Sequence, residues 1–226
     1  LTLGYAVPTA ASSREFSDLQ ALLFFKEWHA DRFQQVYGVP YSLTFPIAVA
    51  VVRTLEKREF RKVNAHSVSE VREILPGLPC FIYTGVRCRS DINLGISFNS
   101  EDSVGESNLK IAVAKSLQGK SFKDIAAALH NAMTGAEKGR QEFLSDWTFI
   151  LNNIGGIGDD FGNSIFAGDV TAELNIGAVN KETGKAIMQV FFDHRVFDGK
   201  LASSFRNTVY AELMRHTLPE LARSLY

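Results

Sequence analysis

An apolar stretch that ends in a compact polar turn is the feature that most constrains the fold of this chain. Residues 186–192 are strongly apolar and read as a strand, and His194, Asp198 and Gly199 follow directly after it. A histidine takes and gives a proton near neutral pH, an aspartate can brace a turn, and a glycine allows backbone conformations that other residues resist. The pattern therefore predicts a strand that delivers a histidine to a turn, followed by a helix over residues 200–215.

The order of the remaining elements predicts an α+β fold. Apolar residues at helical spacing predict one helix over residues 19–37, with Ser17 and Asp18 as its cap, and a more uniformly apolar, buried helix over residues 43–55. Another helix is expected to start at Ser121 with a capping-box-like sequence. Strands are expected at residues 1–7, 81–86, 92–98, 109–117, 147–151 and 172–179. We therefore expect helices packed on a mixed or antiparallel sheet.

Composition narrows the functional classes. The chain has 226 residues, of which 46% are hydrophobic, and a formal net charge of −1. This length suffices for one large core, so residues 1–226 are expected to form a single domain. The charge balance favours neither nucleic acid nor an anionic membrane, and no stretch approaches the ~20 apolar residues of a membrane span. Cys80 and Cys88 lack metal-ligand spacing, and the start at Leu1 suggests a processed or excised part of a longer protein.

Two motifs carry a resemblance to known enzymes. The H-x-x-x-D-G pattern resembles the active-site motif of chloramphenicol acetyltransferases. The longer form D-H-R-x-x-D-G, which adds Asp193 and Arg195, resembles the dihydrolipoamide acyltransferases at the core of 2-oxoacid dehydrogenase complexes. Residues 146–155 resemble the G-T-F-T-x-S-N-L-G segment of the same family. The resemblance implies a trimeric, chloramphenicol acetyltransferase-like sandwich that moves an acyl group between a lipoyl thiol and coenzyme A without a metal.

The resemblance also implies roles for the residues of the turn. His194 would be the general base that deprotonates the attacking thiol. Asp198 would brace the turn rather than serve as the acid of a catalytic triad, and Arg195 and Arg206 are the candidate partners for its carboxylate. Gly199, together with Asp193 and Arg195, would shape the turn, and no residues are assigned to binding coenzyme A.

A second part of the expected site lies far away in the sequence. Asn152 stands where the family has a serine or threonine, whose hydroxyl donates to the oxyanion of the tetrahedral intermediate. The amide N–H of Asn152 could take this role. Family members form the site between two subunits, with the histidine from one and the serine or threonine from the next. We therefore expect a homotrimer in which His194 of one chain faces Asn152 of another.

Three functions remain open at this point. The first is the acyltransferase core of a 2-oxoacid dehydrogenase complex, with the other subunits of that complex as partners. Pyruvate is the expected 2-oxoacid. The second is a non-catalytic core subunit of the protein X type, which the departure at Asn152 and the lack of the family's lipoyl domain and N-terminal arm favour. The third is a free-standing acetyltransferase that uses coenzyme A. The expected compartment is the mitochondrial matrix in a eukaryote and the cytoplasm otherwise.

Overall fold

One six-stranded mixed sheet forms the centre of the protein. The computed structural model describes all residues except 1–8, 76–77, 102–106, 159, 161 and 163–168. Within the sheet, β4, β6 and β7 run parallel to one another, and the remaining neighbours pair antiparallel. In spatial order the strands are β1 (Thr9–Phe16), β8 (Ala186–Asp193), β7 (Ala172–Ile176), β6 (Phe149–Asn153), β4 (Leu94–Glu101) and β5 (Ser107–Ala114). The expected mixed α+β architecture is confirmed.

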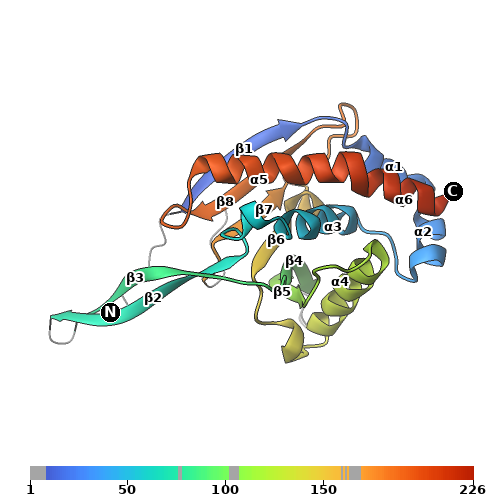
Figure 1. Ribbon diagram of the computed structural model, residues 1–226. Helices are drawn as coiled ribbons and strands as arrows, with labels where there is room; N and C mark the ends of the chain where they lie inside the picture. Colours follow the sequence, from blue (N-terminus) through green and yellow to red (C-terminus); the bar gives the residue numbers. More distant parts are fainter. Residues whose placement is uncertain (1–8, 76–77, 102–106, 159, 161, 163–168) are drawn as a thin grey trace.

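Three helices cover one face of this sheet (Figure 1). They are α3 (Thr44–Leu55), α4 (Phe122–Glu137) and α5 (Gly199–Glu212). Every residue of α3 except Arg53 is buried, as its uniformly apolar sequence predicts. Smaller elements complete the layer: α1 (Gln20–Trp28), α2 (Ala30–Tyr37), α6 (Leu218–Leu225), a π-helical turn over Leu213–Thr217, and 3-10 turns over Arg58–Phe60, Gln141–Phe143 and Ile154–Ile157.

The helix starts show where local sequence signals succeed and fail. Ser121 caps α4, and its hydroxyl accepts a hydrogen bond from the backbone N–H of Asp124 at 3.2 Å, as predicted. The expected cap at Ser17 and Asp18 is wrong, because the Ser17 hydroxyl donates to the Asp18 carboxylate at 2.7 Å instead of binding the helix end. The single helix expected over residues 19–37 is broken at His29 into α1 and α2. The strand expected at residues 1–7 lies outside the described residues.

A two-stranded hairpin extends away from the body of the protein (Figure 1). It consists of β2 (Ala65–Leu75) and β3 (Leu78–Cys88), which pair antiparallel. Its base is anchored by backbone hydrogen bonds from Ser67 to Asp169 and from Thr171 to Ala65, at 2.7 and 3.1 Å. Isolated two-stranded ribbons are only marginally stable in water. We call this hairpin the arm.

The two faces of the central sheet differ in chemistry. Alternate residues such as Leu151, Leu174 and Val190 face the helices and belong to the hydrophobic core. The residues between them include Asn152 of β6, which is in register with Asn175 of β7 and, beyond it, Gln189 of β8. A row of amide side chains therefore crosses the face that is turned away from the helices.

Candidate active site

His194 lies in the turn between β8 and α5, at the surface of the protein. Its side chain is exposed, and its imidazole has no hydrogen bond to any residue that the structure describes. Its ring centroid is 5.6 Å from that of Phe192, the last apolar residue of the strand. An exposed imidazole without a hydrogen bond to the protein can exchange a proton with a bound substrate.

The residues on either side of His194 hold the turn in place. Asp193 has no exposed side-chain surface, and its carboxylate accepts hydrogen bonds from the backbone N–H of Arg195 at 3.0 Å and from the Nε and Nη2 of the same residue at 2.9 and 2.7 Å. The Arg195 guanidinium in turn lies 4.7 Å from the ring centroid of Tyr83 in β3. This clamp ties the histidine turn to strand β3 of the arm.

Asp198 caps the helix that follows. Its Oδ1 accepts a hydrogen bond from the backbone N–H of Leu201 at 3.0 Å, which makes it the N-cap of α5. Neither Arg195 nor Arg206 pairs with it: Arg195 binds Asp193, and Arg206 donates to Ser12 Oγ at 2.9 Å. The geometry is that of a structural brace, although the role of Asp198 in catalysis stays a prediction.

Gly199 does not have the special backbone conformation expected from the sequence. It is the first residue of α5, and its φ is outside the left-handed region that favours glycine. A Cβ added at this position would meet only Phe192 Cζ, at 3.9 Å. The expectation that this turn requires a glycine for its backbone shape is therefore wrong.

Asn152 lies near the carboxyl end of β6, whereas His194 follows the carboxyl end of β8, which runs in the opposite direction. It is half-buried, and its Nδ2 donates to Asn175 Oδ1 at 2.8 Å. Asn152 is two strands away from β8, where Gln189 occupies the same row, and His194 follows Gln189 by five positions. With ~4.8 Å between strands and ~3.3 Å per residue, the two side chains are about 19 Å apart in one chain. A single subunit therefore does not bring the two predicted catalytic residues together.

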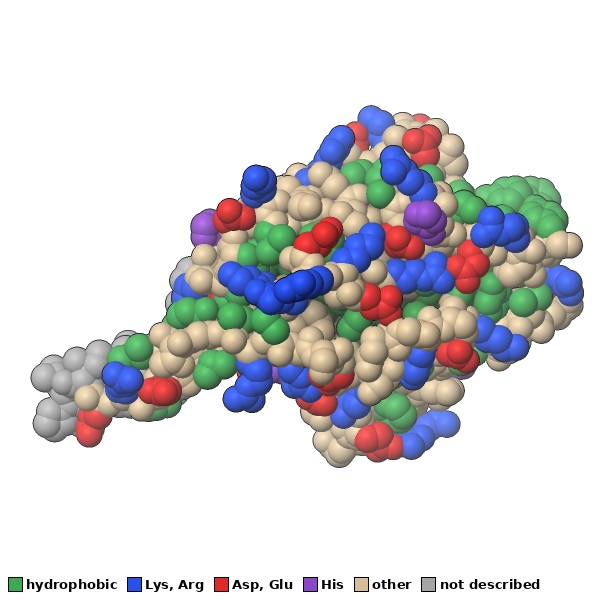
Figure 2. All heavy atoms as spheres, viewed as in Figure 1, with side chains coloured by type: hydrophobic (Ala, Val, Ile, Leu, Met, Phe, Trp, Pro, Cys, Tyr) green, Lys and Arg blue, Asp and Glu red, His purple; other side chains and the backbone are tan. Residues whose placement is uncertain are grey.

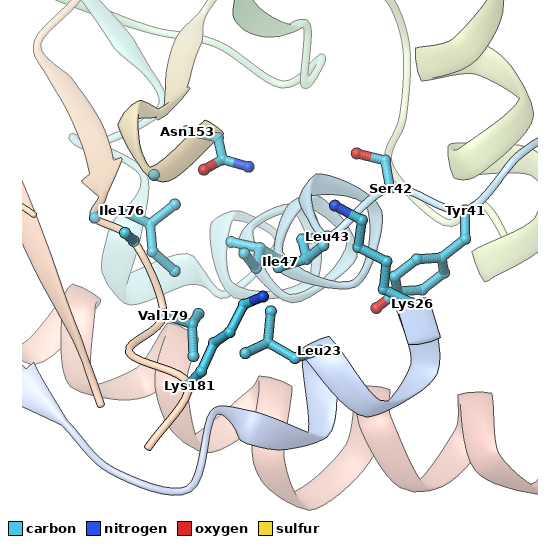
Figure 3. A pocket seen from close by; sticks show the side chains of 13 residues that line it. Leu23, Lys26, Tyr41, Ser42, Leu43, Ile47, Asn153, Ile176, Val179 and Lys181 are labelled. Atoms are coloured by element: carbon cyan, nitrogen blue, oxygen red, sulfur yellow. The ribbon is translucent and has the colours of Figure 1, made fainter. Parts of the chain in front are cut away.

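A cavity of about 450 Å³ lies beyond the carboxyl ends of the parallel strands β6 and β7 (Figure 3). Its apolar lining includes Leu23, Leu43, Ile47, Ile176 and Val179. In Figure 3, Lys26 extends into this hollow from α1, and Lys181 from the segment that follows β7. Neither ammonium group has a carboxylate partner among the described residues. The cavity thus suits a ligand with an apolar stem and a negatively charged end.

The backbone around this cavity is packed closely. Asn153 Nδ2 donates to Thr44 Oγ1 at 3.0 Å, which joins the end of β6 to the start of α3. At Gly155 an added Cβ would lie 2.6 Å from the backbone of Ala178, so only a glycine allows the two segments to approach. The Tyr41 hydroxyl donates to the backbone carbonyl of Leu22 at 3.1 Å, and burial raises the pKa of Tyr41, so this group remains a neutral donor.

Sequence reasoning did not identify this cavity. Lys26 and Lys181 read as ordinary exposed lysines, and they converge only in the folded chain. The one available signal was general: open sheets bind ligands at the carboxyl ends of their parallel strands. Using it requires the strand order, which the sequence does not provide.

Two further observations concern other classes of site. Within the described ranges, no three histidine, cysteine, aspartate or glutamate side chains are grouped so that they could hold a metal ion. Likewise, none of the described helices is both long enough and apolar enough to cross a membrane.

Comparison with solved structures shows the same fold in several acyltransferases. The probable dihydrolipoamide acetyltransferase of Listeria monocytogenes 4b F2365 aligns with a TM-score of 0.75 and 22% identity, over 92% of this chain and 85% of that one. The dihydrolipoamide acetyltransferase of Azotobacter vinelandii gives 0.71 and 17%, over 94% and 84%, and the cubic core of the pyruvate dehydrogenase multienzyme complex gives the same values. A chloramphenicol acetyltransferase gives 0.54 and 15%, over 91% and 88%.

Sequence comparison identifies the family. No curated protein sequence gives a match. The family model of the 2-oxoacid dehydrogenases acyltransferase (catalytic domain), however, matches residues 8–218, which is most of the chain. The same residues form the sheet, the covering helices and the histidine turn described above. The chain therefore belongs to the family of 2-oxoacid dehydrogenase acyltransferase catalytic domains, and it has the chloramphenicol acetyltransferase-like fold.

Proposed function

We propose that the chain is an active acyltransferase core that moves an acyl group between a lipoyl thioester and coenzyme A, with His194 as the general base. The observation that carries this proposal is the clamp between Asp193 and Arg195, which holds an exposed, unbonded imidazole in a defined turn. The ion pair joins the residues immediately before and after His194, and its Asp193 carboxylate is fully buried. In the similar Azotobacter vinelandii enzyme, a histidine and an asparagine four positions later were investigated for roles in catalysis, and Asp198 has the same spacing from His194 here.

The proposed reaction has two steps. His194 accepts the proton of the attacking thiol, and the resulting thiolate attacks the thioester carbonyl and forms a tetrahedral oxyanion. The C–S bond to the original thiol then breaks, and that thiolate takes the proton back from the imidazolium of His194. Donors near the oxyanion stabilise the intermediate, and Asn152 of another subunit is the proposed donor.

A homotrimer supplies the missing half of the site. The separation of about 19 Å between Asn152 and His194 excludes a site within one chain, and a shared interface is the way to bring them together. The arm supports this assembly, because a two-stranded ribbon that projects into solvent needs a covering surface to be stable. A similar structure is the cubic core of a pyruvate dehydrogenase multienzyme complex, and we propose that this chain likewise assembles with the subunits of such a complex.

The cavity beyond β6 and β7 is the proposed site for one of the two substrates. Coenzyme A combines phosphates with a long, flexible chain that ends in a thiol. The two lysines of the cavity are suited to bind the phosphates, and its apolar lining is suited to pack against the flexible chain of coenzyme A. The cavity also adjoins Asn153, the neighbour of Asn152 in the chain. The side chain of Asn153 turns toward α3 and that of Asn152 toward the opposite face of the sheet, so the proposed oxyanion donor does not itself line this cavity.

An acyl-transfer assay with acetyl-CoA and dihydrolipoamide tests the proposal. The wild-type protein should form acetyl-dihydrolipoamide, and His194→Ala should lower the turnover by ~10²–10⁴, the usual contribution of a general base. His216→Ala is the matched control, because His216 is also exposed but lies in the π-helical turn after α5. The elution volume and the circular dichroism spectrum of His194→Ala should equal those of the wild type. Wild-type turnover in this variant would contradict the assignment.

One observation favours the second candidate, a non-catalytic core subunit. An amide replaces the family's hydroxyl at Asn152, and one of its N–H groups is already bonded to Asn175. In an active site of the proposed kind, Asn152→Ser should change the turnover little, because one donor replaces another. In a site that has lost its activity, the wild type should be inactive and Asn152→Ser should raise the rate by ~10-fold or more. Measuring both proteins with the same substrates decides between the two candidates.

A further inference from the structure

A second hollow, away from the histidine turn, lies between the end of β1 and the carboxyl-terminal half of α5. Its volume is about 410 Å³, and its lining includes Arg14 from β1 and Asn207, Tyr210 and Arg215 from α5 and the turn that follows it. The hollow shares no residue with the lysine-lined cavity. Asn207 lies eight positions beyond Gly199, or about 12 Å along the helix from the histidine turn. The hollow is therefore a separate feature of the surface.

The charges around this hollow are positive and unbalanced. Arg14 and Arg215 line it, and neither forms an ion pair with any described residue. Glu15 also lines the hollow, but its carboxylate is bound to Lys185 at 2.9 Å. Figure 2 shows Lys and Arg side chains on the face along α5, interspersed with Asp and Glu side chains. A negatively charged ligand would meet two arginines whose charge no carboxylate has neutralised.

A third arginine lies buried behind this surface. Arg206 is 5% exposed, and its guanidinium lies 5.9 Å from the ring centroid of Phe16, a lining residue that Arg14 approaches to 5.3 Å. Its Nη1 donates to Ser12 Oγ at 2.9 Å, whereas its Nε has no hydrogen-bond partner and no described carboxylate pairs with it. A buried charge without a counter-ion is costly.

The direction of the Arg206 pKa agrees with this geometry. Burial lowers the pKa of Arg206, and the nearby positive charge of Arg14 lowers this pKa further. The guanidinium nevertheless stays protonated in proteins. The surroundings therefore destabilise the charged guanidinium of Arg206. A negative charge in the neighbouring hollow would offset this destabilisation.

We propose that the hollow between β1 and α5 binds a small phosphate-bearing anion, with Arg14 and Arg215 as direct ligands and the charge of Arg206 acting from beneath. Arginine presents a planar fork of donors that matches phosphate oxygens in pairs. The Asn207 side chain adds an amide donor from α5. The phosphate can be the free ion or part of a larger molecule such as a nucleotide, and the volume of the hollow accommodates either.

Isothermal titration calorimetry with inorganic phosphate, and separately with ADP, tests the proposal. The wild-type protein should bind at least one of them, and binding of ADP alone would identify a nucleotide as the source of the phosphate. Arg14→Gln and Arg215→Gln should each weaken binding by about tenfold or more, the value of one hydrogen bond to a charged group. Arg32→Gln, a change of an exposed arginine on α2 outside the hollow, is the matched control and should leave the affinity unchanged.

Arg206 needs a variant of its own. Arg206→Met keeps an apolar stem of similar length and should weaken binding without removing a direct ligand. Since this buried change can impair folding, the two surface variants decide the question independently. Absence of binding to the wild type at millimolar phosphate and ADP, or equal binding by the double variant Arg14→Gln/Arg215→Gln, would overturn the proposal.

Discussion

Within the histidine turn, three neighbouring polar residues have three separate functions. The carboxylate of Asp193 forms an ion pair with Arg195, and the carboxylate of Asp198 accepts a hydrogen bond from the first turn of α5. His194 alone remains exposed without a hydrogen bond in the described structure. In the structure, the sequence motif is thus mainly a set of supports around one exposed imidazole. The geometry of these supports can be tested separately from the chemistry of the histidine.

Asp198 provides such a test. Asp198→Asn keeps an oxygen that can accept from the N–H of Leu201, so stability and acyl transfer should remain close to the wild type. Asp198→Ala removes the cap and should lower the free energy of unfolding by about 1 kcal/mol. Urea unfolding and the acyl-transfer assay measure the two effects. A loss of activity in Asp198→Asn as large as that in His194→Ala would show that the negative charge, not the cap, is required.

At the scale of elements, the arm is the feature whose stability is least accounted for by packing within one subunit. Beyond its base, where His66 forms a single β-bridge with Val170, its two strands pair with each other, and the side chain of Val71 is 60% exposed. Strand β3 of the arm contacts the histidine turn, because the Arg195 guanidinium lies over the ring of Tyr83. A subunit that covers the arm would therefore be well placed to bring its own Asn152 toward this turn.

Val71→Asp should weaken the proposed trimer, because it places a charge on an apolar surface that the interface would bury. Analytical ultracentrifugation over a range of micromolar concentrations should show a shift toward monomer, with an unchanged circular dichroism spectrum. Val71→Ile keeps the apolar contact and should remain trimeric. If Val71→Asp and the wild type sediment alike as trimers, the arm does not form the interface.

At the scale of the whole molecule, the distance between Asn152 and His194 limits how the proposed site can be formed. The two side chains belong to strands of the same sheet, and the register places them about 19 Å apart. No rearrangement of side chains closes such a gap. Catalysis by both residues is therefore possible only in an assembly, whereas the fold itself is complete in one chain.

Subunit mixing tests this directly. His194→Ala and Asn152→Ala should each be nearly inactive as homotrimers. Mixed trimers, isolated through two different affinity tags, should regain activity because roughly one site in three combines an intact histidine with an intact asparagine. Trimers that carry both tags on His194→Ala subunits are the control and should stay inactive. Mixed trimers without activity would contradict a site shared between subunits.

The features that the sequence determined are those that depend on near neighbours along the chain. The uniformly apolar run of α3 predicted a buried helix, Ser121 predicted the cap of α4, and the apolar stretch before His194 predicted β8 and its turn. Each of these signals involves residues within a few positions of one another, which is the range of helix capping and strand alternation. The motif around His194 also sufficed to indicate the family.

Other features were decided only by the tertiary structure. The strand β2 was missed, because its sequence mixes charged and apolar residues and its pairing partner lies in β3. The unpaired charge of Arg206 depends on Ser12 and Arg14, which are nearly two hundred positions away in the chain. The separation of Asn152 from His194 follows from strand order and register. Such features arise from contacts between distant segments, and local sequence preferences contain no information about which segments will meet.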